Sequence, residues 1–364
     1  MNHGVPFRPA PKASLGLPPR HKDPAARASA CGPVRCRGIA PQQRQAPTCT
    51  RTAGRQWSHF ECQVSSDGES NVFDQTGALH MTETRPSVAD KRRAFQQLHE
   101  AGCFAIPNPW DVGSARFLQS LGFKALATTS SGFAWSQGRP DAPGSRDVVL
   151  AHLHDMVVAT DVPMNADFEN GYARDAAGVA QNVRLAVETG VAGLSIEDST
   201  GDASSPLYPL DTAVERMRAA RKAIDTAGGD TLLVGRAECL LVGRPDLDET
   251  IARLRAYAQA GADCLYAPGI RTREQIAAVA AGVAPKPLNL LIGSASELTM
   301  AEIAALGVRR VSVGGALART AWGGFMRAAR LIAEQGNFDG LANATSGVEL
   351  DSFFRDDLEK RSAP

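Results

Sequence analysis

The sequence has little that would point to a membrane or nucleic-acid partner. It contains no apolar run close to the roughly 18–20 residues of a membrane-spanning helix, so we expect no membrane partner. Its 39 basic residues balance 39 acidic ones. From Met81 onward, 34 acidic residues outnumber 29 basic residues, and such a mildly acidic body does not favour binding to nucleic acid.

Cysteine is scarce and follows no useful spacing. The chain has seven cysteines in 364 residues, and the last three, Cys103, Cys239 and Cys264, are far apart. This pattern predicts neither a disulfide framework nor a zinc site, and it favours a reducing, cytoplasmic compartment. Cys239 has no histidine nearby in the sequence, so we interpret it as a packed structural thiol.

Histidine and lysine are missing from the places where two kinds of barrel enzyme need them. All seven histidines lie at or before His154, which disfavours the hydrolases that bind zinc through several histidines. Five lysines follow Met81, and none of them ends an apolar, strand-like segment. A Schiff-base aldolase is therefore not expected.

Residues 1–80 lack both helical and strand periodicity. Their first sixty positions contain nine prolines and ten basic residues but one acidic residue. We predict a disordered tail, or an upstream extension that is not part of the mature protein. An organelle presequence is the alternative, but the prolines would break its amphipathic helix. Met81 resembles a natural start, and Ser87 is a suitable N-cap for the helix that follows.

The rest of the chain alternates regularly between apolar, β-rich segments and amphipathic segments of helical length. The eight apolar segments are 103–107, 125–130, 162–168, 193–198, 231–238, 264–269, 287–292 and 310–315. Eight strand–helix units predict an α/β fold, a (β/α)8 TIM barrel over residues 81–340, with a C-terminal helical extension over 341–364. A doubly wound sheet is the alternative, but "NPWDVGSAR" after the first strand is not its glycine-rich phosphate turn.

Polar residues follow the predicted strands, where barrel enzymes carry their chemistry. They are Ser130, Ser131, Gly132, Asp167, Glu169, Glu197, Asp198, Arg236, Glu238, Asn289, Gly314 and Gly315, with Asp141 in the loop after the second strand. Carboxylates at one mouth repel each other unless a cation offsets them, and a hard divalent ion, Mg2+ or Mn2+, is the simplest one. Asp167 and Glu169 are two residues apart, so both would face the mouth if the strand continues that far.

Each of these features also has a purely structural interpretation. Asp167 and Glu169 could belong to a solvated turn in which the Asp side chain accepts from the backbone. Arg236 could pair with a carboxylate across the barrel without touching a ligand. Residues 130–132 could form an ordinary tight turn. An acidic pair at the end of an apolar strand, Glu197–Asp198, is harder to explain structurally.

Six motifs follow one another in a fixed order along residues 88–335. They are "NPWDVGSAR", "TTSSGFAWSQGRPD", "ADFENGY", "GLSIEDS", "GRAE" and "GADCLYAPG". Together they resemble the isocitrate lyase and phosphoenolpyruvate mutase superfamily. The resemblance implies a Mg2+-dependent barrel, assembled as a homotetramer, that binds a small carboxylate substrate. That substrate would be a 2-oxo acid or phosphoenolpyruvate, and the reaction would pass through an enolate.

The resemblance also implies roles for individual residues. Asp167 would be the direct metal ligand, with Glu169, Glu197 and Asp141 around the metal's waters. The residues expected to act in catalysis are Arg236, Asp141 and Glu238. The residues expected to bind or support the substrate are Ser131, Gly132, Trp110, Asp111 and Asn289.

Two departures from the superfamily narrow the expected reaction. The lyases carry Cys, Lys and His in the loop after the fourth strand, where this chain has "STGDASSPLYPL". The mutases carry a His after the sixth strand, where this chain has "LYAPG". We therefore favour C–C cleavage of a small 2-oxo acid, as in an oxaloacetate-type hydrolase or decarboxylase. The alternatives are P–C chemistry on a phosphonopyruvate-type substrate, an aldolase that uses pyruvate enolate, and a barrel that binds a carboxylate without turnover.

Overall fold

The computed structural model describes residues 85–142 and 144–362. The chain divides into two units, Met1–Phe73 and Asp74–Pro364, and all the described residues belong to the second one. The predictions made for residues 1–80 therefore lie outside the described residues.

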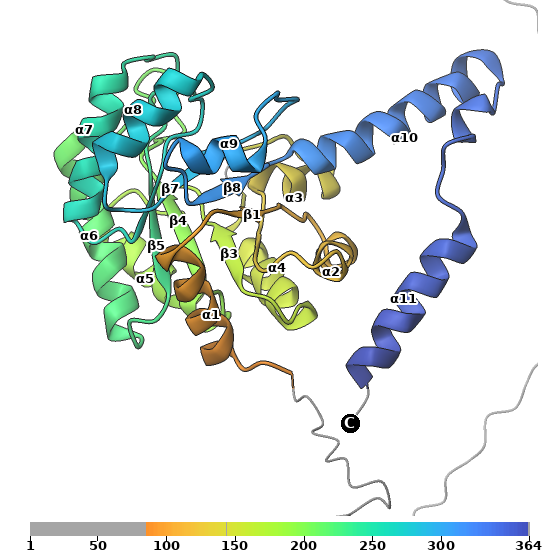
Figure 1. Cartoon of the computed structure of the whole chain (residues 1–364), viewed down its shortest axis with the longest axis horizontal. Helices are drawn as coiled ribbons and strands as arrows, with labels where there is room; N and C mark the ends of the chain where they lie inside the picture. The colour runs from red at the N-terminus through yellow and green to blue at the C-terminus, as the bar shows by residue number, and fades with distance from the viewer. Residues whose placement is uncertain (1–84, 143, 363–364) are drawn as a thin grey trace, which may run out of the picture. The chain divides into compact units, whose positions relative to one another are not determined.

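Eight short parallel strands form the centre of the fold (Figure 1). They are β1 (Phe104–Ile106), β2 (Leu126–Ala127), β3 (Met164–Asp167), β4 (Gly193–Glu197), β5 (Leu232–Arg236), β6 (Cys264–Tyr266), β7 (Leu288–Leu291) and β8 (Arg310–Ser312). Their order in the sheet is β1-β8-β7-β6-β5-β4-β3-β2. The Ala127 N–H donates to the Pro107 carbonyl at 3.1 Å, which joins β2 to the end of β1. The (β/α)8 barrel predicted from the alternating pattern is confirmed.

Helices follow the strands and cover the outside of the barrel. They are α1 (Val88–Glu100), α2 (Val112–Ser120), α3 (Ser130–Ser136), α4 (Arg146–Ala159), α5 (Ala176–Glu188), α6 (Leu210–Thr226), α7 (Leu247–Gln259), α8 (Arg273–Val283) and α9 (Met300–Ala305). Ser87 caps α1 with a capping box, as predicted. Asp175 caps α5 and Asp246 caps α7, so side-chain oxygens satisfy N–H groups that a helix leaves unpaired at its start.

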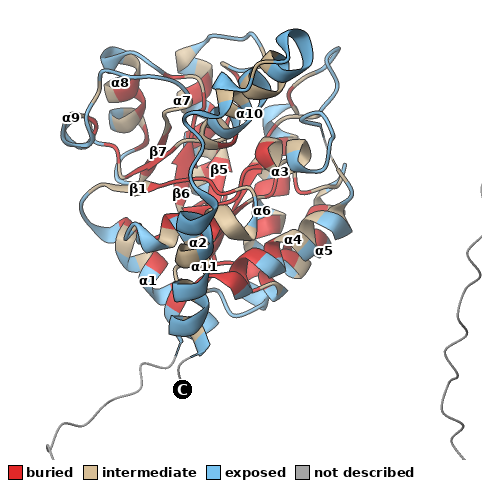
Figure 2. Ribbon diagram, turned by 90° about the vertical axis from the view of Figure 1, so that its right-hand side faces the viewer, coloured by how far each residue is buried: buried red, intermediate tan, exposed pale blue. Residues whose placement is uncertain are grey.

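The core lies between the strands and these helices. Its buried side chains are mainly aliphatic, among them Leu194 and Ile196 of β4 and Met217 of α6, and Figure 2 shows the buried residues concentrated on the strands. The buried polar residues Asn289 and Arg310, by contrast, line a cavity at the barrel mouth. The strands therefore pack aliphatic side chains against the helices, while polar residues share the barrel interior with a small cluster of Val234, Cys264 and Tyr266.

Two long helices follow the last strand. Figure 1 shows α10 (Ala316–Gln335) extending away from the strands, and Ala318 is its one buried residue. A short 3-10 turn, η1 (Asp339–Leu341), precedes α11 (Gly347–Ser362). The α11 helix contacts α2 through a Phe117–Phe353 ring pair and the loop after α4 through an Arg361–Asp161 ion pair of 3.0 Å. The C-terminal helical extension predicted from the sequence is confirmed.

Within the part of the chain that the structure describes, no helix combines the length and the apolar character that crossing a bilayer requires.

Gly235 in β5 offers a test of how tightly the barrel packs against its helices. A Cβ at this position would lie 2.8 Å from the Tyr257 Cβ and 3.2 Å from the Ala262 Cβ. Those atoms are fixed by the backbone, so Gly235→Ala would force α7 away from β5. We expect the free energy of unfolding to fall by about 1–3 kcal/mol, measured by urea denaturation. Gly347→Ala, where a Cβ would meet open space, is the matched control, and equal losses in the two variants would contradict this packing.

Candidate active site at the barrel mouth

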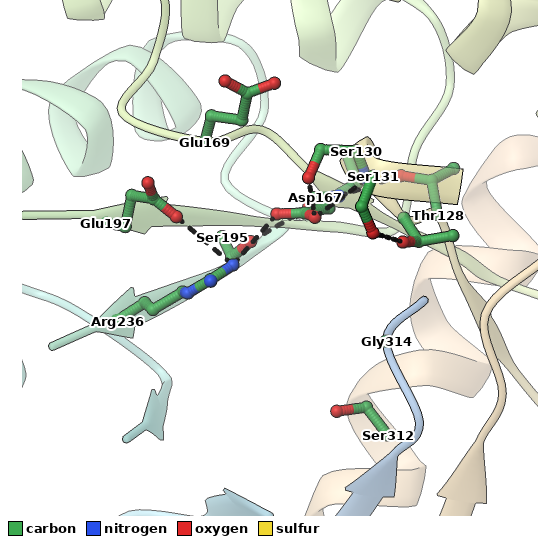
Figure 3. Close-up of polar contacts among 12 residues, drawn as sticks. Thr128, Ser130, Ser131, Asp167, Glu169, Ser195, Glu197, Arg236, Ser312 and Gly314 are labelled. Atoms are coloured by element: carbon green, nitrogen blue, oxygen red, sulfur yellow. Dashed lines mark hydrogen bonds and ion pairs between the residues drawn. The ribbon is translucent and has the colours of Figure 1, made fainter. Parts of the chain in front are cut away.

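Arg236, the last residue of β5, lies at the centre of the carboxylate cluster. Its Nη1 is 3.3 Å from the Asp167 Oδ1 and 3.2 Å from the Glu197 Oε2. Figure 3 marks both contacts with dashed lines. Its Nε also contacts the Glu238 carboxylate. These carboxylates come from the ends of β3 and β4 and from just beyond β5, so the fold brings together residues that are far apart in the sequence.

Asp167 is held in place by the segment after β2. The Ser130 N–H donates to its Oδ2 at 3.1 Å, and the Ser130 hydroxyl donates to the same oxygen at 2.9 Å. The Asp167 N–H donates to the Thr128 hydroxyl at 2.9 Å. Because Arg236 contacts the other oxygen, Asp167 has a fixed orientation and is the best-anchored carboxylate of the cluster.

Glu169 does not share a strand face with Asp167, although its spacing in the sequence predicted that it would. The β3 strand ends at Asp167, and Glu169 has a φ of 45°, so the strand alternation that would place both side chains on one face does not continue. Figure 3 shows the Glu169 carboxylate turned away from Arg236. The Tyr172 hydroxyl donates to the Glu169 Oε1 at 2.6 Å. The Glu197 N–H donates to the Glu169 backbone carbonyl at 2.9 Å.

The cluster holds more carboxylates than one guanidinium can neutralise. Burial raises the pKa of Glu169 to about 7, and the Asp167 and Asp141 charges add to the rise. Burial also raises the pKa of Glu197, with Glu238 and Asp167 as further causes. For Asp141, partial burial and then the charge of Asp167 raise the pKa. The cluster therefore holds more carboxyl groups than burial beside one guanidinium allows to be ionised together.

A hard divalent cation fits the chemistry of this donor set. The donors are carboxylate oxygens, the ligands that Mg2+ and Mn2+ prefer. Burial and then mutual repulsion raise the pKa values of Glu169 and Glu197, and such an ion would favour their charged forms. Among residues 85–142 and 144–362, however, no three His, Cys, Asp or Glu side chains already form a metal-binding group. Arg236 occupies the centre of the cluster instead, so the assignment of Asp167, Glu169 and Glu197 to a metal stays a prediction.

A polar cavity of about 160 Å³ lies beside the cluster. It is lined by Asp167, Arg236 and Asp141, and by Ser131 and Asn289. A larger depression of about 580 Å³ shares Ser131 and Asp141 with it. The structure thus brings two of the predicted substrate-binding residues into one cavity with Arg236.

The backbone N–H of Gly132 has a partner within the protein. Its N–H donates to the Thr129 hydroxyl at 3.3 Å as part of the α3 cap. A Cβ at this position would lie 2.7 Å from a Thr129 side-chain carbon and 2.9 Å from the Trp110 Cβ. The glycine is needed for close packing, and its N–H is already in use.

Trp110 and Asp111 do not line this cavity, so their supporting role stays a prediction. The chain turns directly into α2 after β1, and Asp111 becomes the exposed N-cap of that helix, accepting from the Ser114 N–H at 2.7 Å. Trp110 lies in a shallow surface depression with Trp322 and Phe325 of α10.

Several cavity residues were not predicted from the sequence. They are Asn108, Asn165, Ser195, Arg310 and Ser312. Two of them, Asn165 and Ser195, precede Asp167 and Glu197 by two positions on the same strands. The alternation of side chains along a strand predicts that they face the same side, because residues two apart share a face.

Asp198, the neighbour of Glu197, supports the site from outside the barrel. Its Oδ2 accepts from the Tyr257 hydroxyl at 2.6 Å and from Arg253 at 3.1 Å. Its Oδ1 accepts from the Glu238 N–H at 2.8 Å. Asp198 therefore ties α7 to the segment that carries Glu238, and its role is positional.

Removal of Asp198 should cost stability because it leaves the buried Arg253 without this partner. Asp198→Ala is expected to lower the free energy of unfolding by about 3–5 kcal/mol, measured by urea denaturation. Asp155→Ala on the exposed face of α4 is the matched control, with an expected change within about 0.5 kcal/mol. A change that small in Asp198→Ala would show that this network contributes nothing.

Comparison with known proteins identifies the family. The phosphoenolpyruvate phosphomutase family model matches residues 95–333. A solved structure from Burkholderia cenocepacia J2315, named provisionally as a lyase/mutase, is 47% identical, with a TM-score of 0.71 over 76% of this chain and 97% of that one. An oxaloacetate decarboxylase of Paraburkholderia xenovorans (strain LB400) is 30% identical over 62% of this chain and 75% of its own length.

A further solved structure, of oxaloacetate acetylhydrolase in complex with the product oxalate, is 27% identical to this chain. It covers 74% of this chain and 96% of its own, with a TM-score of 0.66. The barrel, the arrangement of its strand-end residues and the family match agree with the resemblance drawn from the motifs. The chain belongs to the phosphoenolpyruvate phosphomutase family, within the phosphoenolpyruvate mutase/isocitrate lyase superfamily.

Proposed function

We propose that this chain is a Mg2+- or Mn2+-dependent enzyme that cleaves a C–C bond of a small 2-oxo acid of the oxaloacetate type. The observation that carries the proposal is the position of Arg236, which borders a small polar cavity together with Asp167. A cavity of about 160 Å³ suits a small acid, since sites for drug-sized ligands are typically about 300–1,000 Å³.

Asp167 would hold the metal, with Glu169, Glu197 and Asp141 around it, and the bound ion would supply a Lewis acid for the 2-oxo oxygen. The Arg236 guanidinium is placed to stabilise the negative charge that develops on an enolate oxygen when the neighbouring bond breaks. Substrate binding would also release Arg236 from some of its present carboxylate contacts. The Ser131 hydroxyl, which is 3.1 Å from the Thr129 hydroxyl, would orient the substrate carboxylate.

The loop after β4 offers no ready proton donor. Its residues Ser199 and Leu207 form an isolated bridge, and the Tyr208 ring packs against the Arg216 guanidinium at 4.1 Å. Asp202 is exposed, and hydrogen bonds from Ser204 hold its pKa below the ordinary value. Neither Asp202 nor Tyr208 lines the cavity. This favours substrates whose enolate is protonated by solvent, or whose bond is cleaved by water.

The relatives support the same substrate class, because those named for their reaction include oxaloacetate decarboxylases and an oxaloacetate acetylhydrolase. P–C bond chemistry on a phosphonopyruvate-type substrate is the second candidate, and the family model itself favours it. The segment "LYAPG" at the end of β6 lacks the histidine expected of a mutase after that strand, which is why we rank P–C bond chemistry second. An aldolase and a carboxylate-binding barrel without turnover rank below both.

A substrate panel tests this proposal. Oxaloacetate, phosphonopyruvate and isocitrate should be assayed with and without Mg2+, and we expect Mg2+-dependent turnover of oxaloacetate and none of isocitrate. Arg236→Gln should lower kcat by about 10²–10³-fold, and Asp167→Ala should abolish Mg2+ binding in calorimetry. Asp202→Ala is the matched control with unchanged rates. Turnover of phosphonopyruvate alone would replace this proposal with the second candidate.

We also propose that the protein is a homotetramer, in line with the family resemblance. The α10 helix supports this assembly because large apolar side chains on it are exposed, including Trp322, Phe325 and Met326. A second copy of the chain would bury them.

Light scattering at micromolar concentration should give four times the chain mass of 38.5 kDa. Phe325→Asp should lower that mass, because a charge would be buried in the contact, and the exposed Glu334→Gln on the same helix is its control. A wild-type mass of 38.5 kDa would contradict the assembly.

A further inference from the structure

Arg310, the first residue of β8, is a buried cation in the wall of the barrel cavity. Its residue exposure is 3%, and it lines the same cavity as Arg236 and Asp167. In the sheet register it stands beside Asn289, which in turn stands beside Tyr266, the register neighbour of Arg236. Arg236 and Arg310 thus belong to one row of residues around the barrel, separated by two strands.

The hydrogen-bond partners of Arg310 are all neutral. Its Nε donates to the Asn289 Oδ1 at 2.8 Å, and its Nη1 donates to the Asn165 Oδ1 at 3.3 Å. The third partner is the His99 Nε2 at 3.4 Å. Because the His99 Nδ1 is 2.7 Å from the Phe95 carbonyl, its proton is on Nδ1 and Nε2 accepts. Burial lowers the pKa of His99 to about 3, so the imidazole is neutral at pH 7.

No carboxylate neutralises Arg310 within residues 85–142 and 144–362, since it takes part in none of their ion pairs. Arg216 is also buried and has no carboxylate partner among these residues, but both of its terminal nitrogens donate to backbone carbonyls. Two further buried arginines do have carboxylate partners. Arg253 pairs with Asp198 at 3.1 Å, and Arg92 pairs with Asp230 at 2.9 Å. Burial lowers the pKa of Arg310, and the groups that act against this are Cys264 and Tyr266 rather than a carboxylate.

The Nη2 atom of Arg310 is available for a ligand. Among the hydrogen bonds of the described residues, Arg310 uses its Nε and Nη1 atoms. Nη2 has no partner among them and is not fully buried. Its accessible surface therefore faces the cavity that Arg310 lines. Burying a charge is costly unless it is paired, and here an anion entering the cavity would supply the pairing.

We propose that Arg310 binds the second anionic group of the substrate, a carboxylate, and makes the site selective for dicarboxylates over monocarboxylates. The inference rests on the proposed function for the class of substrate. One end of the substrate would face Asp167 and Arg236, and the terminal carboxylate would accept from the Arg310 Nη2. Asn289 positions the guanidinium through its Oδ1, while its own Nδ2 donates to the Ser312 hydroxyl at 3.0 Å.

A purely structural Arg310 would behave differently from a binding residue. If its hydrogen bonds to amides hold the barrel together, its removal should destabilise the protein with or without ligand. If it awaits an anion, removal of the unpaired buried charge should leave the ligand-free protein at least as stable, because hydrophobic replacements of buried ions are often neutral or stabilising. The two readings therefore predict opposite changes in the melting temperature of the ligand-free protein.

The test compares malate with 2-hydroxybutyrate, which replaces the terminal carboxylate of malate by a methyl group. Neither carries a 2-oxo group, so binding to the full-length protein can be measured by calorimetry with Mg2+ and without turnover. We expect wild type to bind malate at least about tenfold more tightly, as a charge-assisted hydrogen bond allows. Arg310→Met should lose that advantage without a change in the affinity for 2-hydroxybutyrate, and Arg310→Lys should recover part of it.

The stability arm uses Arg92→Met as the matched control, since Arg92 donates to the Val191 and Val187 carbonyls and to Asp230. Its melting temperature should fall, and that of ligand-free Arg310→Met should not. Several results would overturn the inference: no preference for malate in wild type, a preference that survives in Arg310→Met, or an Arg310→Met protein that melts early or does not fold. A malate preference that follows Arg310, in a protein that turns over no 2-oxo acid, would keep the subsite and reject the proposed function.

Discussion

The excess of carboxylates around Arg236 is the constraint on which the rest of the site depends. Asp167 and Glu197 share its Nη1 atom, and Glu238 contacts its Nε, but one guanidinium cannot neutralise them together with Glu169. Burial and mutual repulsion raise the pKa values of Glu169 and Glu197. The folded protein therefore holds carboxyl groups whose burial and mutual repulsion a bound cation would offset.

Hydrogen bonds and ion pairs around the barrel hold these carboxylates in place. Asp198 ties Arg253 and Tyr257 of α7 to the Glu238 backbone, and Ser130 holds one oxygen of Asp167. Apolar packing between strands and helices stabilises the fold, while polar residues line the cavity inside the barrel. Arg310 and Arg236 then place positive charge at two points of one small cavity, as a dicarboxylate with a 2-oxo group at one end would require.

Much of the fold and part of the site could be predicted from the sequence. The alternating pattern determined the barrel, and Asp167, Glu197 and Arg236 were found because each one ends an apolar strand. Asp111 shows the ambiguity of such a pattern, because a polar residue after a strand can equally begin the next helix. The shared face of Asp167 and Glu169 failed because the backbone of Glu169 is left-handed, which no side-chain pattern reveals.

Arg310 could not be recognised from the sequence for a related reason. It begins its strand rather than ending it, and an arginine at the start of an apolar segment is usually a solvated residue. Its burial follows from the tilt of the strands, which sets β8 against Asn289 of β7 and brings Asn165 of β3 within reach. Such contacts across a barrel depend on the register of the whole sheet, so they emerge only from the three-dimensional structure.

The most direct test of the account is a crystal structure of the protein with Mg2+ and oxalate, which stands in for the 2-oxo end of the substrate. The account predicts one Mg2+ with an Asp167 oxygen at about 2.0–2.1 Å, oxalate on the same ion, and the Arg236 guanidinium in contact with an oxalate oxygen. A metal bound elsewhere, or oxalate bound away from Asp167 while Arg236 keeps all three of its carboxylate partners, would contradict it.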